Sequence, residues 1–152
     1  MMKSLFLSAA LLIGFAAFAQ QGLNPVSWTF SAKKTSDKTY EVHMTANIQS
    51  GWHIYSQNQP SEAIAYPTNV TINNNPLVKL DGQVKELGKL EKYKDETVNA
   101  TNHQYSNKVD FVQVVKIKSA AKTNLTGSVV FQTCDDHKCL PPKTVNFNVA
   151  LN

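Results

Sequence analysis

Apolar and polar side chains alternate over two long segments of the chain. Between residues 39 and 48 every second side chain is apolar, and the side chains between them are polar. Residues 144–151 repeat this pattern, with Val145, Phe147 and Val149 on one face. Because successive side chains of a strand point to opposite faces, both segments are predicted to be half-buried strands. No window of ten or more residues shows a helical periodicity.

Further segments are rich in the β-branched and aromatic residues that favour strands. Turn-forming Gly, Pro, Asn and Asp separate them. Residues 85–104 are polar and charged, and we interpret them as a long loop or a pair of loops. Seven or more short strands in one compact domain predict an all-β fold, an immunoglobulin-like β-sandwich, with a small barrel as the alternative. The further strand segments are 26–32, 52–56, 68–72, 108–118 and 127–133.

The N-terminal residues have the features of a secretory signal peptide. Lys3 supplies a positive charge, residues 5–16 are apolar, and Ala17-Phe18-Ala19 is a small-x-small cleavage site. The apolar run is shorter than the roughly 20 residues that a spanning helix needs, so a retained membrane anchor is the minor alternative. We expect residues 1–19 to be removed and residues 20–152 to form one exported domain. Its location would be the periplasm or, alternatively, the exterior, where disulfides persist.

The charge of the chain argues against a nucleic-acid partner. The formal net charge is +4, and every one of the basic residues is lysine. Recognition of phosphate and guanine relies on the bidentate arginine fork, and the lysines here are scattered. The sequence also lacks a glycine-rich phosphate loop, a Ser/His/Asp order and a paired-carboxylate motif. We therefore expect neither a nucleotide cofactor nor hydrolase chemistry.

The only two cysteines, Cys134 and Cys139, lie in the segment Phe-Gln-Thr-Cys-Asp-Asp-His-Lys-Cys-Leu-Pro-Pro. If they approach each other they form a disulfide that is either a structural staple or a redox centre. A staple across so short a loop restricts the unfolded chain by only about 2 kcal/mol. A redox pair must be reachable, since exchange proceeds by thiolate attack through a mixed disulfide. Pro141 and Pro142 fix the backbone and remove two amide donors, which ends strand pairing after the loop.

The charged residues of the cysteine loop bear on the acidity of the thiols. Asp135 and Asp136 disfavour a thiolate, whereas Lys138 and a protonated His137 favour it. With a neutral imidazole the loop carries a net charge of −1. Our hypothesis is that the thiols are not strongly acidic, which suits a shuttle between partners better than a strong oxidant.

A metal site is a third alternative, in which Cys134, Cys139 and His137 would be ligands. Structural zinc sites have four ligands, commonly in paired knuckles, and this loop offers three at most. The other histidines, His43, His53 and His103, are distant in sequence. We therefore do not expect a metal.

The cysteine segment resembles a known family. Phe-Gln-Thr-Cys-x4-Cys-Leu-Pro-Pro is found together with Gly-Trp-His-Ile-Tyr-Ser-Gln-Asn at 51–58 and Gly-Lys-Leu-Glu-Lys-Tyr at 88–93. This combination resembles the N-terminal periplasmic domain of the thiol–disulfide interchange protein DsbD, over roughly residues 28–151. The resemblance implies an immunoglobulin-like sandwich with the cysteine pair at one end. It also implies electron transfer from a thioredoxin-like domain or membrane thiol transporter to exported disulfide isomerases or thiol reductases.

The same resemblance implies roles for single residues. Cys139 would form the mixed disulfide with the partner and Cys134 would resolve it, although the residues alone do not separate these roles. His53 and Tyr55 lie where the family has aromatic residues near the pair, and strand alternation places them on one face. Ordinary strand packing is the alternative interpretation of both side chains.

The chain departs from the family pattern at the cap loop, which in the family carries an aromatic tip and shields the cysteines. Here the equivalent place is Val-Lys-Glu-Leu at 84–87, without an aromatic residue. Glu86, Leu87 and Tyr93 are the candidate cap residues, and a solvated loop with a core tyrosine is the alternative. Because the chain ends after this domain, we expect its electron source to be a separate protein. The competing hypothesis is a non-catalytic binding or interaction module with a structural disulfide.

Overall fold

The segments with the clearest alternation are strands. In the computed structural model, which describes residues 23–119 and 122–152, β2 covers Thr39–Ile48 and β11 covers Lys143–Leu151. The predicted signal peptide, residues 1–19, lies outside the described residues. The other strands are β1 (Val26–Ser36), β3 (His53–Tyr55), β4 (Asn69–Ile72), β5 (Val78–Gly88), β6 (Glu91–Asp95), β7 (Ala100–Ser106), β8 (Lys108–Ile117), β9 (Thr123–Phe131) and β10 (Thr133–Cys134).

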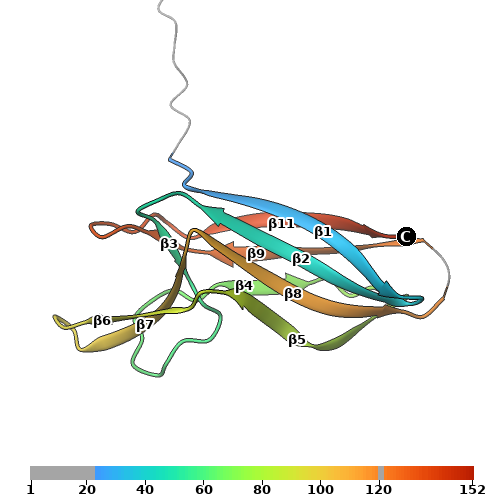
Figure 1. The fold of residues 1–152 in the computed structure, drawn as a ribbon, viewed down its shortest axis with the longest axis horizontal. Coiled ribbons are helices and arrows are strands. Elements are labelled where there is room, and N and C mark those ends of the chain that lie inside the picture. The colour runs from blue at the N-terminus through green and yellow to red at the C-terminus, as the bar shows by residue number, and fades with distance from the viewer. Residues whose placement is uncertain (1–22, 120–121) are drawn as a thin grey trace, which may run out of the picture.

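The strands form three antiparallel sheets. One sheet has the order β1-β2-β8-β5, a second has the order β11-β9-β4, and a third has the order β10-β3-β7-β6. Figure 1 shows the long strands of the first sheet running along the molecule, with β3, β6 and β7 gathered at one end, on the left. The chain between β9 and β11, which carries both cysteines, projects at that same end, and the C-terminus lies at the other.

The core lies between the first and second sheets. Met44 of β2 and Phe111 of β8 are fully buried, and so are Leu125 and Leu151 of the second sheet. Burying one such side chain contributes about 1.5–3 kcal/mol. The indole ring of Trp28 joins the two layers, since its centroid lies 5.8 Å from that of Phe111 in the first sheet and 5.2 Å from that of Phe131 in the second. The predicted all-β, immunoglobulin-like sandwich is confirmed.

The prediction that residues 85–104 form a loop is wrong. This segment contains the end of β5, all of β6 and most of β7. Strands β5 and β6 are at the edges of their sheets, and most of their side chains are exposed on both faces. Charged side chains are usual on edge strands because they discourage pairing with other chains. The alternation that identifies half-buried strands is therefore missing here.

Gly127 of β9 sits where no side chain fits. A Cβ atom at this position would meet the carbonyl oxygen of Thr71 on β4 and would lie 2.5 Å from Cζ of Phe147 on β11. We expect Gly127→Ala to lower the free energy of unfolding by about 1–3 kcal/mol, the usual cost of overpacking. The measurement is denaturant unfolding, with Ser128→Ala as the control at the next, half-buried position. Equal midpoints for the wild-type chain and Gly127→Ala would contradict the packing described.

Candidate functional site

Cys134 and Cys139 are joined by a disulfide at the end of the sandwich. Cys134 ends the two-residue strand β10, which pairs with β3 so that Cys134 lies opposite His53. The two cysteines then face each other as an isolated antiparallel bridge, with an S–S distance of 2.00 Å. The N–H of Asp135 donates to the carbonyl of Lys138 at 2.9 Å, which closes the loop. The six-residue segment is thus a tight hairpin with the disulfide across its base.

The carboxylate of Asp135 holds the turn of this hairpin. Its Oδ1 accepts hydrogen bonds from the backbone N–H groups of His137 at 2.8 Å and Lys138 at 2.7 Å. These bonds, the one from His137 first, hold the pKa of the Asp135 carboxyl below its usual value. The side chains of Asp136 and His137 are exposed at the tip. Asp135 therefore stays ionised and keeps the short loop in one conformation.

The two cysteines differ sharply in exposure. Cys134 is 1% exposed, because β10 places it against β3. Cys139, on the returning arm of the hairpin, is exposed. The disulfide therefore joins one buried and one exposed residue.

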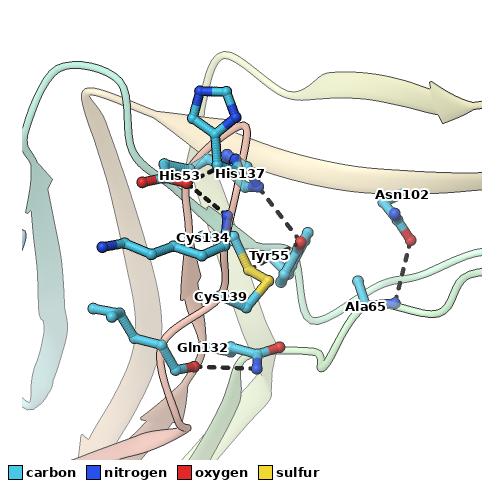
Figure 2. Close-up of a disulfide and its surroundings, with 11 residues drawn as sticks. His53, Tyr55, Ala65, Asn102, Gln132, Cys134, His137 and Cys139 are labelled. Atoms are coloured by element: carbon cyan, nitrogen blue, oxygen red, sulfur yellow. Dashed lines mark hydrogen bonds between the residues drawn. A yellow bond between two sulfur atoms is a disulfide. The ribbon is translucent and has the colours of Figure 1, made fainter.

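His53 and Tyr55 lie on the same face of β3, as the alternation predicted. The hydroxyl of Tyr55 donates to Sγ of Cys134 at 3.2 Å, and its oxygen lies 3.4 Å from Nε2 of His53. The two rings meet edge to face, with 5.3 Å between their centroids (Figure 2). Burial raises the pKa of Tyr55, so the hydroxyl keeps its proton. Burial also lowers the pKa of His53, against the opposing effects of Asp136, Glu91 and Asp135.

A cavity of about 350 Å³ opens over the disulfide. One wall is the cysteine hairpin, and the floor includes His53 and Tyr55. The opposite wall is the loop after β3, where the N–H groups of Ile64 and Ala65 donate to Oδ1 of Asn102 at 3.3 and 3.2 Å. Asn102 is buried on β7, so this amide fixes the loop that faces the disulfide.

The candidate cap residues occupy different places. Tyr93 of β6 lines the cavity and is 54% exposed. Leu87 is 56% exposed on β5 and is not among the residues that line the cavity. Glu86 is likewise not part of the lining, and its carboxylate accepts hydrogen bonds from Ser56 Oγ at 2.7 Å, Gln57 N at 2.6 Å and Tyr105 OH at 2.8 Å. Glu86 therefore ties β5 to the start of the loop after β3.

Lys138 and Pro141 complete the set of residues that the sequence singled out. Lys138 lines the cavity, and its Nζ lies 6.0 Å from the centroid of the Trp52 ring, within the range of a cation–π interaction. Pro141 lies beyond the hairpin and outside the cavity lining. The carbonyl of Leu140, just before it, accepts a hydrogen bond from Nε2 of Gln132 at 3.2 Å.

The sequence analysis did not predict the other residues that line the cavity. These residues are Ile64, Ala65, Asp95, Asn102, Gln104 and Gln132.

The described residues contain neither a metal-binding cluster nor a membrane-spanning helix. Among residues 23–119 and 122–152, no group of three or more His, Cys, Asp or Glu side chains is placed to hold a metal ion. The same residues include no helix with the length and apolar character needed to cross a bilayer. The chemistry open to a disulfide with one exposed cysteine is thiol–disulfide exchange.

The effect of the two hydrogen bonds that Asp135 accepts can be separated from the effect of its negative charge. We expect Asp135→Ala to loosen the hairpin and slow the re-formation of the disulfide from the dithiol, because both hydrogen bonds to the turn are lost. Asp136→Ala is the matched control, since it removes the same charge from the neighbouring exposed position. The measurement is the rate of ring closure after reduction, followed by quenching with an alkylating agent. Equal rates for the two variants would contradict the effect expected from the turn hydrogen bonds.

Comparison with known proteins places the chain among thiol–disulfide proteins. The family model "Thiol:disulfide interchange protein DsbD, N-terminal" matches residues 20–151. None of the curated proteins matches. The reduced DsbD N-terminal domain of Neisseria meningitidis is 18% identical, with a TM-score of 0.49, over 77% of this chain and 80% of that chain. A chain from the complex between the DsbD and PilB N-terminal domains of the same organism is 16% identical, with a TM-score of 0.49, over 86% and 88%.

The N-terminal periplasmic domain of ScsB from Proteus mirabilis is similar as well. It is 14% identical to this chain, with a TM-score of 0.51. The similarity covers 83% of this chain but only 44% of that chain. At this level of identity the likeness supports the fold alone.

Proposed function

The chain belongs to the family of the N-terminal domain of the thiol:disulfide interchange protein DsbD, and we propose that its cysteine pair carries electrons between thiol proteins. The observation that carries this proposal is the asymmetry of the disulfide. Cys139 is exposed, whereas Cys134 is buried and its sulfur accepts a hydrogen bond from the Tyr55 hydroxyl. In such a pair, the sulfur of the exposed Cys139 is the one that a partner thiolate attacks, and the sulfur of the buried Cys134 is the leaving group.

The exchange follows from this geometry. A partner thiolate attacks Sγ of Cys139, the bond between the two cysteine sulfurs breaks, and its electron pair goes to Sγ of Cys134. The hydroxyl of Tyr55 already points at that sulfur and donates a hydrogen bond to the thiolate that forms there. A second thiol of the partner loses its proton to water, and the resulting thiolate attacks the partner's own sulfur and releases Cys139 as a thiolate. The thiolates of Cys134 and Cys139 each take up a proton from water. The domain leaves with two thiols and the partner with a disulfide, so two electrons have moved.

The reverse sequence delivers the electrons. Cys139, as a thiolate, attacks an oxidised partner, and Cys134 resolves the mixed disulfide and restores the internal bond. Because the resolving sulfur lies against Cys139 at the base of the hairpin, the mixed disulfide is short-lived unless the partner blocks closure. The assignment of Cys139 as the attacked sulfur and Cys134 as the resolving sulfur is therefore part of our proposal.

Partners and location are also part of the proposal, and family membership supports them. We propose that the electron donor is a thioredoxin-like domain or membrane thiol transporter. The acceptors would be exported disulfide isomerases or thiol reductases. We place the exchange in the periplasm, after removal of a signal peptide at residues 1–19, because a disulfide persists there.

The reduction potential of the Cys134–Cys139 pair separates a carrier from a staple. We expect equilibration of the protein against glutathione or dithiothreitol to give a potential between roughly −180 and −270 mV, the range of exchange proteins. A value well below about −300 mV would identify a structural disulfide and favour a non-catalytic binding module. The melting temperatures of the oxidised and reduced forms serve as a second readout, since loss of a carrier disulfide should change them little.

The two single-cysteine variants test the assignment of roles. We expect the free Cys139 thiol in Cys134→Ser to react with an aromatic disulfide reagent faster than the free Cys134 thiol in Cys139→Ser. The difference should be on the order of tenfold or more, because exchange requires access to the sulfur. Rates are compared per thiolate, and the melting temperatures of both variants confirm that each is folded. Equal rates, or a faster Cys134, would overturn the assignment.

A further inference from the structure

The hydroxyl group of Tyr55 lies within hydrogen-bonding distance of two groups, Sγ of Cys134 and Nε2 of His53. The Tyr55 oxygen lies 3.2 Å from Sγ of Cys134 and 3.4 Å from Nε2 of His53 (Figure 2). A phenol has a single hydrogen to donate, and the imidazole Nε2 either donates or accepts according to its own protonation. The state of His53 therefore decides which neighbour receives the hydrogen of Tyr55.

We propose that His53 is a positioning residue that directs the hydroxyl hydrogen of Tyr55 toward the sulfur of Cys134. This inference rests on the exchange function proposed above. When Nε2 of His53 carries a hydrogen, it donates to the Tyr55 oxygen, and the hydroxyl hydrogen is left for Sγ. When Nε2 carries no hydrogen, it accepts the hydrogen bond from the Tyr55 hydroxyl, because an imidazole nitrogen is a stronger acceptor than a sulfur in a disulfide.

The surroundings of His53 set the balance between these states. His53 is half-buried, and burial favours the neutral imidazole and lowers its pKa. The carboxylates of Asp136, Glu91 and Asp135 oppose this effect. The charged and titratable groups near it come from its own strand, from the cysteine hairpin and from β6, and are Tyr55, Asp135, Asp136, His137, Lys138, Glu91, Tyr93 and Asp95.

The exchange step itself shifts this balance. As the bond between the cysteines breaks, its electron pair creates a negative charge on Sγ of Cys134, two hydrogen bonds away from His53. This charge favours a hydrogen on Nε2, which His53 gains from water, and it draws the Tyr55 hydroxyl toward the sulfur. Protonation of His53 therefore stabilises the leaving thiolate. The rate of attack, expressed per attacking thiolate, should rise as the pH falls through the pKa of His53.

The experiment uses the oxidised protein and 2-mercaptoethanol, an uncharged thiol. The initial rate of reduction is measured between about pH 5 and 8, where histidine titrates, and is divided by the concentration of free thiolate. We expect the wild-type rate constant to increase toward low pH. His53→Gln keeps a donor that does not titrate, so its rise toward low pH should be weaker than that of the wild type. Tyr55→Phe should show the same weaker rise and be slower on the order of tenfold, the effect of one hydrogen bond to a charged group.

A remote histidine provides the matched control. His43 on β2 is bonded to Asp110 at 2.6 Å in the first sheet, away from the cavity, so His43→Gln should keep the wild-type profile.

The outcomes separate the two proposals. A wild-type profile in His53→Gln would overturn the role of His53 and leave the exchange function intact. A wild-type disulfide that 2-mercaptoethanol does not reduce without unfolding would instead overturn the exchange function.

Discussion

The site depends on the pairing of the two-residue strand β10 with β3. This pairing sets Cys134 opposite His53 and Thr133 opposite Ile54. Because side chains alternate between faces along a strand, a shift of one residue would turn Cys134 away from Tyr55 and toward the opposite face. The register therefore decides which sulfur is buried, which hydroxyl reaches it, and where the hairpin returns Cys139 to the surface.

The rest of the sandwich keeps this register in place. Strand β3 is held between β10 and β7, and Tyr55 is fixed further by Thr68, whose Oγ1 donates to its carbonyl at 2.5 Å. The loop after β3 is tied at one end by Glu86 and in its middle by Asn102. The functional groups thus lie on short strands and loops at one end of a sandwich whose long strands form the core. This is the usual division between a rigid scaffold and reactive loops.

The sequence predicted what depends on local periodicity and missed what depends on distant partners. Strands β2 and β11 were predicted because the side chains on one face are more deeply buried than those on the other, and the alternation of apolar and polar residues follows this difference. Strand β6 was missed because most of its side chains are exposed on both faces. The pair Gln59 and His103 shows the second limit. Their amide and backbone groups bond reciprocally, at 2.6 and 2.9 Å, across 44 positions, and no spacing in the sequence signals such a contact.

The difference between the two cysteines has the same origin. Both stand in one short loop with similar neighbours in sequence, so neither charge nor spacing separates them, and only the pairing of β10 buries one of them. A disulfide across a loop this short restricts the unfolded chain by about 2 kcal/mol in the entropy model, similar to the burial of one core side chain. The sandwich contains many such side chains, so stability alone does not require the bond. What the fold adds to this disulfide is an unequal environment for its two sulfurs. In the exchange proposed here, this difference means that attack at Cys139 would always expel the thiolate of Cys134, next to the Tyr55 hydroxyl that already donates to its sulfur.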